Sequence, residues 1–278
     1  MKKSVMILTL ALIFVASVMF MQAQSTALLA QDHDVISIYG SGMFTTFADD
    51  YLQMPEEETR EMERELGQDF DLDVDSGFGG EAGLELQPIP GLGFGAGYGL
   101  ILAGADDTAS MYEEGAEINI EATNNDMMIH SMRGHLGIDL MDLVGADVPI
   151  NLTARAGAGY YFGDKESSVN ISGQEGGQSV EIELQELVDF EGEPGFHFGG
   201  GMGINLTDTF EIFAEGNYRL LEFEEAKVSG HLRTYEDGRV VEEEIIEEQH
   251  MHLSEIPEID ESLDLSGFEL MGGISLNF

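Results

Sequence analysis

The chain has 278 residues, no cysteine and a formal net charge of −43 at pH 7, with 54 acidic against 11 basic residues. So few basic residues exclude a nucleic-acid partner, because phosphate binding needs a positively charged surface. The absence of cysteine excludes thiolate metal sites and thiol nucleophiles, and it is compatible with an exported protein that forms no disulfides.

The N-terminal segment has the pattern of a secretory signal peptide. Lys2 and Lys3 form a basic start, residues 5–21 are an uninterrupted apolar run, and small or polar residues follow at 22–25. We expect residues 1–23 to be removed on export, although Ala23 lacks the usual small residue two positions earlier. The alternative is a retained membrane anchor, since about 17–25 apolar residues can cross a bilayer.

We expect residues 24–278 to form one β-domain. Past residue 34, segments of about ten residues alternate between apolar and polar or small positions, which is the period of a strand with two different faces. In 78–87, for example, Phe78, Leu84 and Leu86 occupy even positions, whereas Glu81 and Glu85 occupy odd ones. The same pattern predicts seven more strands, at about 35–47, 92–102, 131–140, 150–162, 196–206, 210–220 and 268–278. The first of these is ambiguous, because both of its faces carry apolar residues.

The predicted connections alternate in length. Those at about 87–91, 141–149 and 207–209 are short, and those at about 48–77, 104–127, 163–195 and 222–265 are long. No apolar run of helical length follows residue 21, so a helical membrane protein is excluded. We therefore expect an all-β fold, namely an eight-stranded antiparallel up-and-down transmembrane β-barrel with long acidic external loops.

Two of the long loops carry local signals. Residues 55–67 have the Pro start, acidic first turn and Gly end of a short helix. The sequence 236–239 lies between two β-rich runs and predicts a hairpin that extends above the membrane.

The polar face carries paired charges. Arg133, Arg155 and Arg219 fall on this face in three separate strands. The same face offers six carboxylates as partners, namely Glu81, Glu85, Asp139, Glu211, Glu215 and Glu269. Eight strands enclose a space only wide enough for side chains or one small ligand, and buried charges require partners. We predict an ion-paired interior with lipid outside; the alternatives are a narrow channel for small solutes or cations, and a soluble exported β-barrel or sandwich.

Aromatic residues on the apolar face gather near the two ends of the predicted strands. On the loop side they are Phe78, Tyr160, Phe162, Phe196, Phe198, Tyr218 and Phe268, and on the turn side Phe94, Phe210 and Phe278. This arrangement is typical of the interfacial girdles of a membrane barrel, although tryptophan is absent.

The chain ends on Phe278, with Leu276, Ile274 and Leu270 at alternating positions before it. With the strand pattern above, it resembles the OmpA/OmpX-type eight-stranded outer-membrane barrels. The resemblance implies a place in the cell outer membrane, contact with its lipid, and a terminal signal (Phe278, Leu276, Ile274) that the barrel-assembly machinery reads. Because loops carry function more often than scaffolds do, we also expect the external loops to be the part that would contact an extracellular ligand.

The candidate chemical motifs are weak. Glycines at every second position of 91–99 are followed by no helix, so they do not form a nucleotide loop. Acidic residues at 69–75 lack the register of an EF-hand. His250 and His252 lie among glutamates and are the weak candidates for a metal site.

We therefore expect no enzyme, no cofactor and no specific metal. The expected role is structural, or one of surface interaction. Because a charge of −43 repels itself unless salt screens it, we also infer a halophilic source, with an ordinary acidic surface as the alternative.

Overall fold

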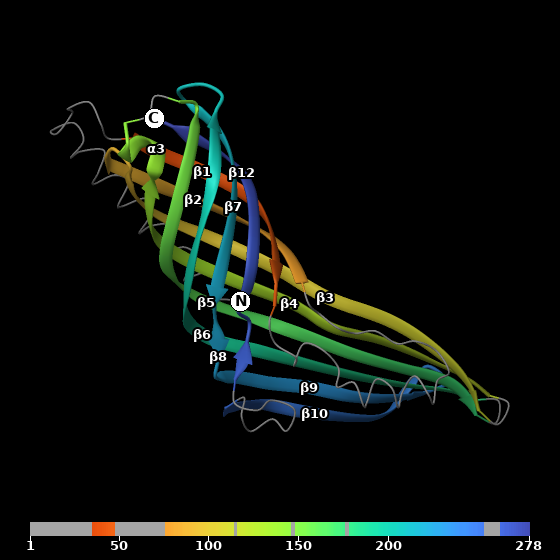
Figure 1. The fold of residues 1–278 in the computed structure, drawn as a ribbon. Coiled ribbons are helices and arrows are strands. Elements are labelled where there is room, and N and C mark those ends of the chain that lie inside the picture. The colour runs from red at the N-terminus through yellow and green to blue at the C-terminus, as the bar shows by residue number, and fades with distance from the viewer. Residues whose placement is uncertain (1–34, 48–75, 114–115, 146–147, 176–177, 253–261) are drawn as a thin grey trace.

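The computed structural model describes residues 35–47, 76–113, 116–145, 148–175, 178–252 and 262–278. Eight of its strands form a closed antiparallel ring (Figure 1). In chain order they are β1 (Val35–Thr46), β2 (Ser76–Ile89), β3 (Leu92–Glu113), β4 (Ala116–Asp139), β5 (Ile150–Glu175), β6 (Gln178–Asn205), β7 (Phe210–Leu220) and β12 (Gly267–Asn277).

The ring closes where the first strand meets the last. β1 pairs with β12, and the backbone N–H of Phe278 donates to the carbonyl of Ile36 at 2.9 Å. The predicted eight-stranded barrel is therefore confirmed. Among the described residues, no helix has both the length and the apolar character needed to cross a bilayer.

The short connections gather at one end of the barrel. Between β2 and β3, Gly91 has a φ of 77°, which favours glycine. Between β4 and β5 a short helix, α3 (Leu140–Leu143), begins at Asp139, whose carboxylate accepts from the backbone N–H groups of Met141 and Asp142. The third connection is the turn between β6 and β7.

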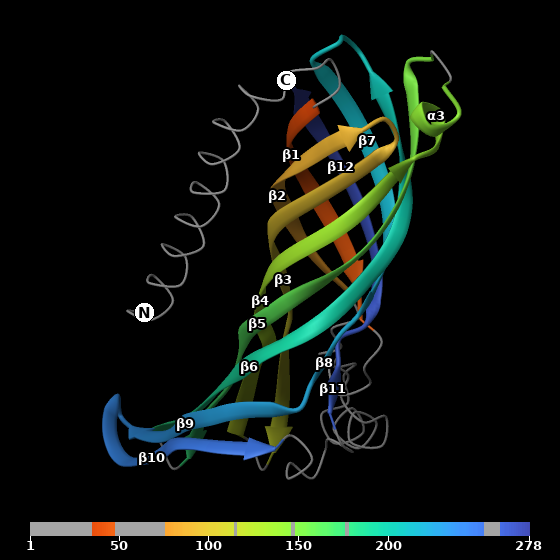
Figure 2. The ribbon, with the colours of Figure 1, turned by 90° about the vertical axis from the view of Figure 1, so that its left-hand side faces the viewer.

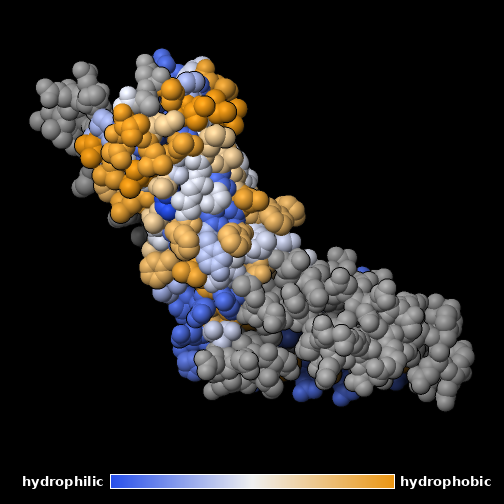
Figure 3. All heavy atoms as spheres, in the orientation of Figure 1, coloured by the Kyte–Doolittle hydropathy of each residue, from blue (hydrophilic) through white to orange (hydrophobic). Residues whose placement is uncertain are grey.

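The outer face of the ring is apolar and exposed. Phe78, Phe196 and Phe268 each expose at least 60% of their surface. Figure 3 shows hydrophobic residues gathered over the barrel part of the molecule. Aromatic rings contact one another at the long-strand rim, with Tyr218 and Phe268 edge to face at 4.9 Å between ring centres. The structure also resolves the ambiguous first strand, since Tyr39 and Met43 are buried inside and Ile38 lies outside.

At the opposite end, β3 to β6 continue far beyond the ring. Two further strands, β9 (Glu225–Glu236) and β10 (Arg239–His252), extend this sheet in the order β10-β9-β6-β5-β4-β3 (Figures 1 and 2). We call this part, with the ends of β3 to β6, the outer sheet. The β9–β10 turn at Asp237 and Gly238, both with positive φ, confirms the predicted hairpin.

Strands occupy much of three segments that were expected to be loops, at about 104–127, 163–195 and 222–265. Residues 104–127 and 163–195 lie mostly in strands, because the antiparallel ladders of the barrel continue through them. Cross-strand pairs such as Val169 with Leu184 support this pairing. The expected helix at 55–67 and the signal peptide at 1–23 lie outside the described residues, as does most of the loop at 48–77.

An apolar cluster lies inside the barrel at the end nearest the outer sheet. β8 (Glu222–Phe223) and β11 (Leu263–Asp264) pair with each other and bring Phe223 and Leu263, both fully buried, into it. We call this cluster the apolar plug; its buried members are Met43, Ile101, Met127, Ile129, Tyr161, Val188, Phe190, Leu221, Phe223, Ala226, Leu263, Leu265 and Met271.

Candidate functional site: the barrel interior

The ion pairs nearest the apolar plug centre on Glu269. Its carboxylate binds Arg133 through two hydrogen bonds, of 2.6 and 2.9 Å, and accepts from Nη1 of Arg219 at 2.7 Å. Nε and Nη2 of Arg219 donate to the carbonyl of Leu265 at 3.0 and 2.7 Å. Arg219 and Glu269 are both fully buried, so this group fastens the plug to the barrel wall.

Glu81 extends this group across the barrel. Its carboxylate lies 3.3 Å from Nε of Arg133, and its other oxygen accepts from the hydroxyl of Tyr39 at 2.7 Å. Tyr39 is buried on the inner face of β1.

A second group lies closer to the short turns. Arg155 binds Glu85 at 2.7 Å through Nη2 and binds Glu215 through Nη1. His135 lies 3.5 Å from Glu85, and its ring meets the ring of His197 edge to face at 6.4 Å between centres. The middle of the barrel interior is therefore filled by charged and aromatic side chains.

Two expected members of the network occupy other positions. Asp139 caps α3 instead of binding an arginine. Glu211 accepts from Nδ2 of Asn151 at 2.8 Å. The structure thus brings Arg133, Arg155, Arg219, Glu81, Glu85, Glu215 and Glu269 into two groups of ion pairs and leaves Asp139 and Glu211 outside both.

The glycines of β3 have a packing role in this interior. A Cβ atom at Gly93 would contact the carboxylate of Glu85, and one at Gly95 would clash with the His135 ring. A Cβ at Gly97 would contact the hydroxyl of Tyr39. This strand is therefore bare on its inner face because long polar side chains from other strands fill the space beside it.

Several interior residues were not singled out from the sequence. His135, His197 and Tyr161 share the odd-numbered positions of their strands with the arginines, so the alternation could have identified them. Tyr39 could not have been assigned this way, because both faces of β1 are apolar.

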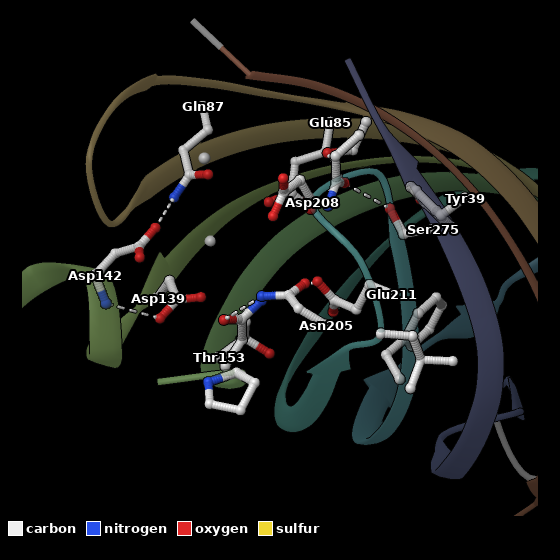
Figure 4. Close-up of a pocket in the computed structure, with 18 of the residues that line it drawn as sticks. Tyr39, Glu85, Gln87, Asp139, Asp142, Thr153, Asn205, Asp208, Glu211 and Ser275 are labelled. Carbon is white, nitrogen blue, oxygen red and sulfur yellow. Dashed lines mark hydrogen bonds between the residues drawn. The ribbon is translucent and has the colours of Figure 1, made fainter. Parts of the chain in front are cut away.

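A polar cavity of about 560 Å³ lies at the short-turn end, and we call it the vestibule (Figure 4). The ion pairs of Arg155 border it on the inside, and α3 and the β6–β7 turn border it at the mouth. Its charged lining residues are Glu85, Asp139, Asp142, Arg155, Asp208 and Glu211.

The remaining sequence candidates lie at the surface. Phe278, Leu276 and Ile274 are exposed on the outer face of the barrel. His250 lies 3.2 Å from Glu191, and His252 lies 3.6 Å from Glu225. Within the described part of the chain, no three metal-binding side chains converge.

A closed ring with an apolar exterior and an ion-paired interior defines a transmembrane β-barrel. The family comparison agrees: this chain belongs to the outer membrane protein beta-barrel domain family, whose sequence model matches residues 9–236. The protein is therefore an integral protein of the outer membrane, surrounded by lipid. By the rule for such barrels, we expect the short turns to face the periplasm and the outer sheet to lie outside the cell.

Solved structures of outer-membrane proteins are similar to this chain at low identity. Neisserial surface protein A is 11% identical, covers 89% of this chain and 100% of its own, and has a TM-score of 0.37. A major outer membrane protein from Thermus thermophilus is 12% identical, with coverages of 88% and 99% and a TM-score of 0.43. OprG from Pseudomonas aeruginosa is 11% identical, with coverages of 89% and 97% and a TM-score of 0.42. No curated protein matches the chain.

Proposed function

We propose that the barrel has a structural and surface-interaction role, in which it anchors the acidic outer sheet for contact with an extracellular ligand. The observation that carries this proposal is strand length. β3, β4, β5 and β6 contain 22, 24, 26 and 28 residues, whereas a tilted strand crosses a bilayer with about 9–11. The additional residues serve the outer sheet and not the membrane crossing.

The role is non-enzymatic and needs no cofactor. Seven interior charges stabilise one another in ion pairs, namely those of Arg133, Arg155, Arg219, Glu81, Glu85, Glu215 and Glu269. Such pairing indicates a rigid scaffold and not a reactive centre, because each of these carboxylates is bound to an arginine.

A narrow channel is the alternative, and the apolar plug argues against it. Purified protein in planar bilayers is expected to give no conductance steps. The double variant Leu221→Asp, Leu263→Asp places two charges in the apolar plug. These charges are expected to admit water and small ions, so that the variant conducts. Steady conductance of the unmodified protein would support the channel instead.

The surface role can be tested with trypsin on intact cells. Arg239 is exposed beside the β9–β10 turn, so cleavage there is expected while the membrane is whole, and Arg239→Gln should lose that fragment. Cleavage that appears only after the cells are broken would contradict an external hairpin.

Assembly is proposed to depend on the C-terminal residues, after export directed by residues 1–23. Phe278 is 69% exposed while its backbone closes the ring, so its side chain is available to the barrel-assembly machinery. Deleting Phe278 is expected to lower the amount of protein in the envelope, whereas deleting Gly238 in the hairpin turn should not. Equal envelope levels would remove this role.

A further inference from the structure

The vestibule holds negative charge that the protein does not neutralise. Arg155 is the single basic residue of its described lining, and it is already bound by Glu85 and Glu215. No ion pair within the described chain involves the four other acidic lining residues, Asp139, Asp142, Asp208 and Glu211. Walls of one sign around a narrow space concentrate the potential and attract cations.

The same cavity has an excess of hydrogen-bond acceptors. The amide of Asn151 donates to Glu211, that of Asn205 donates to Asn151, and that of Gln87 donates to Asp142. Oδ1 of Asn205 is buried and receives no hydrogen bond from the described residues. A ligand that suits this lining must therefore bring N–H donors as well as positive charge.

The size and layout of the cavity exclude a compact metal ion. A volume of about 560 Å³ is that of a small-molecule site. The carboxylates are distributed along the wall, with Asp139 and Asp142 beside α3 and Asp208 and Glu211 beside the β6–β7 turn (Figure 4). Three metal ligands do not converge anywhere in the described residues.

Apolar residues also contribute to the lining of the vestibule. Phe213 is buried on its inner wall, whereas Ile138, Val148 and Leu206 are more than 40% exposed and lie at its mouth. Methylene groups of a ligand can pack against these side chains while its charged ends reach the carboxylates. We propose that the vestibule binds a small oligoamine, that is, an aliphatic chain with two or more ammonium groups, from the periplasmic side. This site is separate from the proposed contact surface on the outer sheet.

Spermidine is a suitable probe, because it is aliphatic and carries several ammonium groups. The full mature protein, labelled with ¹⁵N in detergent micelles, would be titrated in about 0.3 M NaCl, so that screening weakens binding to the acidic exterior. The side-chain amides of Asn151 and Asn205 report on the vestibule, and that of Asn170 in the outer sheet reports on the exterior. Saturable shifts of the two vestibule amides are expected at concentrations that leave Asn170 unchanged.

A matched pair of variants tests which carboxylates bind. Asp208→Asn with Glu211→Gln keeps the side-chain shapes and removes two vestibule charges. Glu222→Gln with Glu224→Gln removes two exposed charges at the opposite end. The first pair is expected to weaken spermidine binding at least tenfold, and the second less than twofold.

Three outcomes would overturn the proposal. One is equal weakening by the two variants, which would mean general attraction to an acidic protein. Another is a parallel shift of Asn170. The third is saturation of the vestibule amides by Mg²⁺ at the same concentration as spermidine, which would mean an adventitious counterion only.

Discussion

At the scale of single residues, Arg219 joins the apolar plug to the barrel wall. Its side chain is fully buried and donates to both Glu269 and the Leu265 carbonyl. In Arg219→Met the carbonyl would lose its charged donor and Glu269 would keep one arginine. Removing one partner from a buried ion pair costs about 3–5 kcal/mol. We expect a loss of stability near the lower end of this range. The measurement is the unfolding midpoint, followed by heat-dependent gel mobility.

The matched control is Arg233→Met in the outer sheet. Arg233 binds Glu243 at 2.8 Å, but both side chains are more than one-third exposed. Exposed pairs contribute at most about 1 kcal/mol. Similar small losses for the two variants would mean that the plug is not held by Arg219.

Lys165 predicts a pH dependence of stability. It lies on β5 three residues beyond Phe162, outside the membrane, and burial lowers its pKa from 10.5 to about 8. Between these two pH values the unfolded state holds a proton that the folded state lacks, so stability rises as the pH increases through this window. Below pH 8 Lys165 is charged in both states, so the full cost of burying its charge lowers the stability of the folded protein.

The measurement is the urea midpoint of refolded protein at pH 7.5 and pH 10. The shift in pKa corresponds to a gain of up to about 3 kcal/mol. Lys165→Met should flatten the profile, and Lys227→Met, which removes a more exposed lysine, should not. An unchanged slope in Lys165→Met would assign the dependence to other groups.

The alternation of residues identified the inner face of every membrane-crossing strand except β1, and for Arg133, Arg155 and Arg219 this was sufficient. It could not identify partners, because Arg133 meets Glu269 136 positions away only through closure of the ring. Asp139 differs for a local reason: the chain turns into α3 directly after it, and its carboxylate caps that helix.

At the scale of elements, the membrane-crossing strands could be predicted, but of the outer sheet only the β9–β10 hairpin could. Lipid on one face forces alternation within the bilayer. Beyond the membrane, β6 is not constrained by lipid, and glutamates and aliphatic residues such as Glu183 and Leu184 follow one another. The strand there is defined by its hydrogen-bonded pairing with β5 and β9.

The β9–β10 hairpin should therefore be separable from the barrel. Its strands pair with each other and with the outer part of β6, and none of the eight ring strands depends on them for closure. Replacing 228–249 with a short Gly–Ser linker is expected to leave the heat-dependent mobility shift in place, with a midpoint within a few degrees. Loss of the folded form in this variant would make the hairpin part of the barrel's folding unit.

At the scale of the whole molecule, charge is the dominant property outside the membrane. The chain carries −43, and export with loss of two lysines would make this −45. The interior arginines are all paired with carboxylates, so the excess negative charge lies on residues outside these ion pairs, those of the outer sheet among them. Exposed like charges repel over the Debye length, about 10 Å at 0.1 M salt and about 3 Å at 1 M.

Salt should therefore stabilise the outer sheet more than the barrel. Raising NaCl from 0.1 to 1 M is expected to slow proteolysis at Arg239 and to raise the unfolding midpoint of the full protein, while the variant without the hairpin gains less. Sucrose at equal osmolality controls for general exclusion from the protein surface. A gain of equal size in sucrose would mean that screening is not the cause. A larger gain in the unfolding midpoint in NaCl than in sucrose would show that the outer sheet is adapted to saline surroundings. Salt would then stabilise the sheet by screening the repulsion between its acidic side chains.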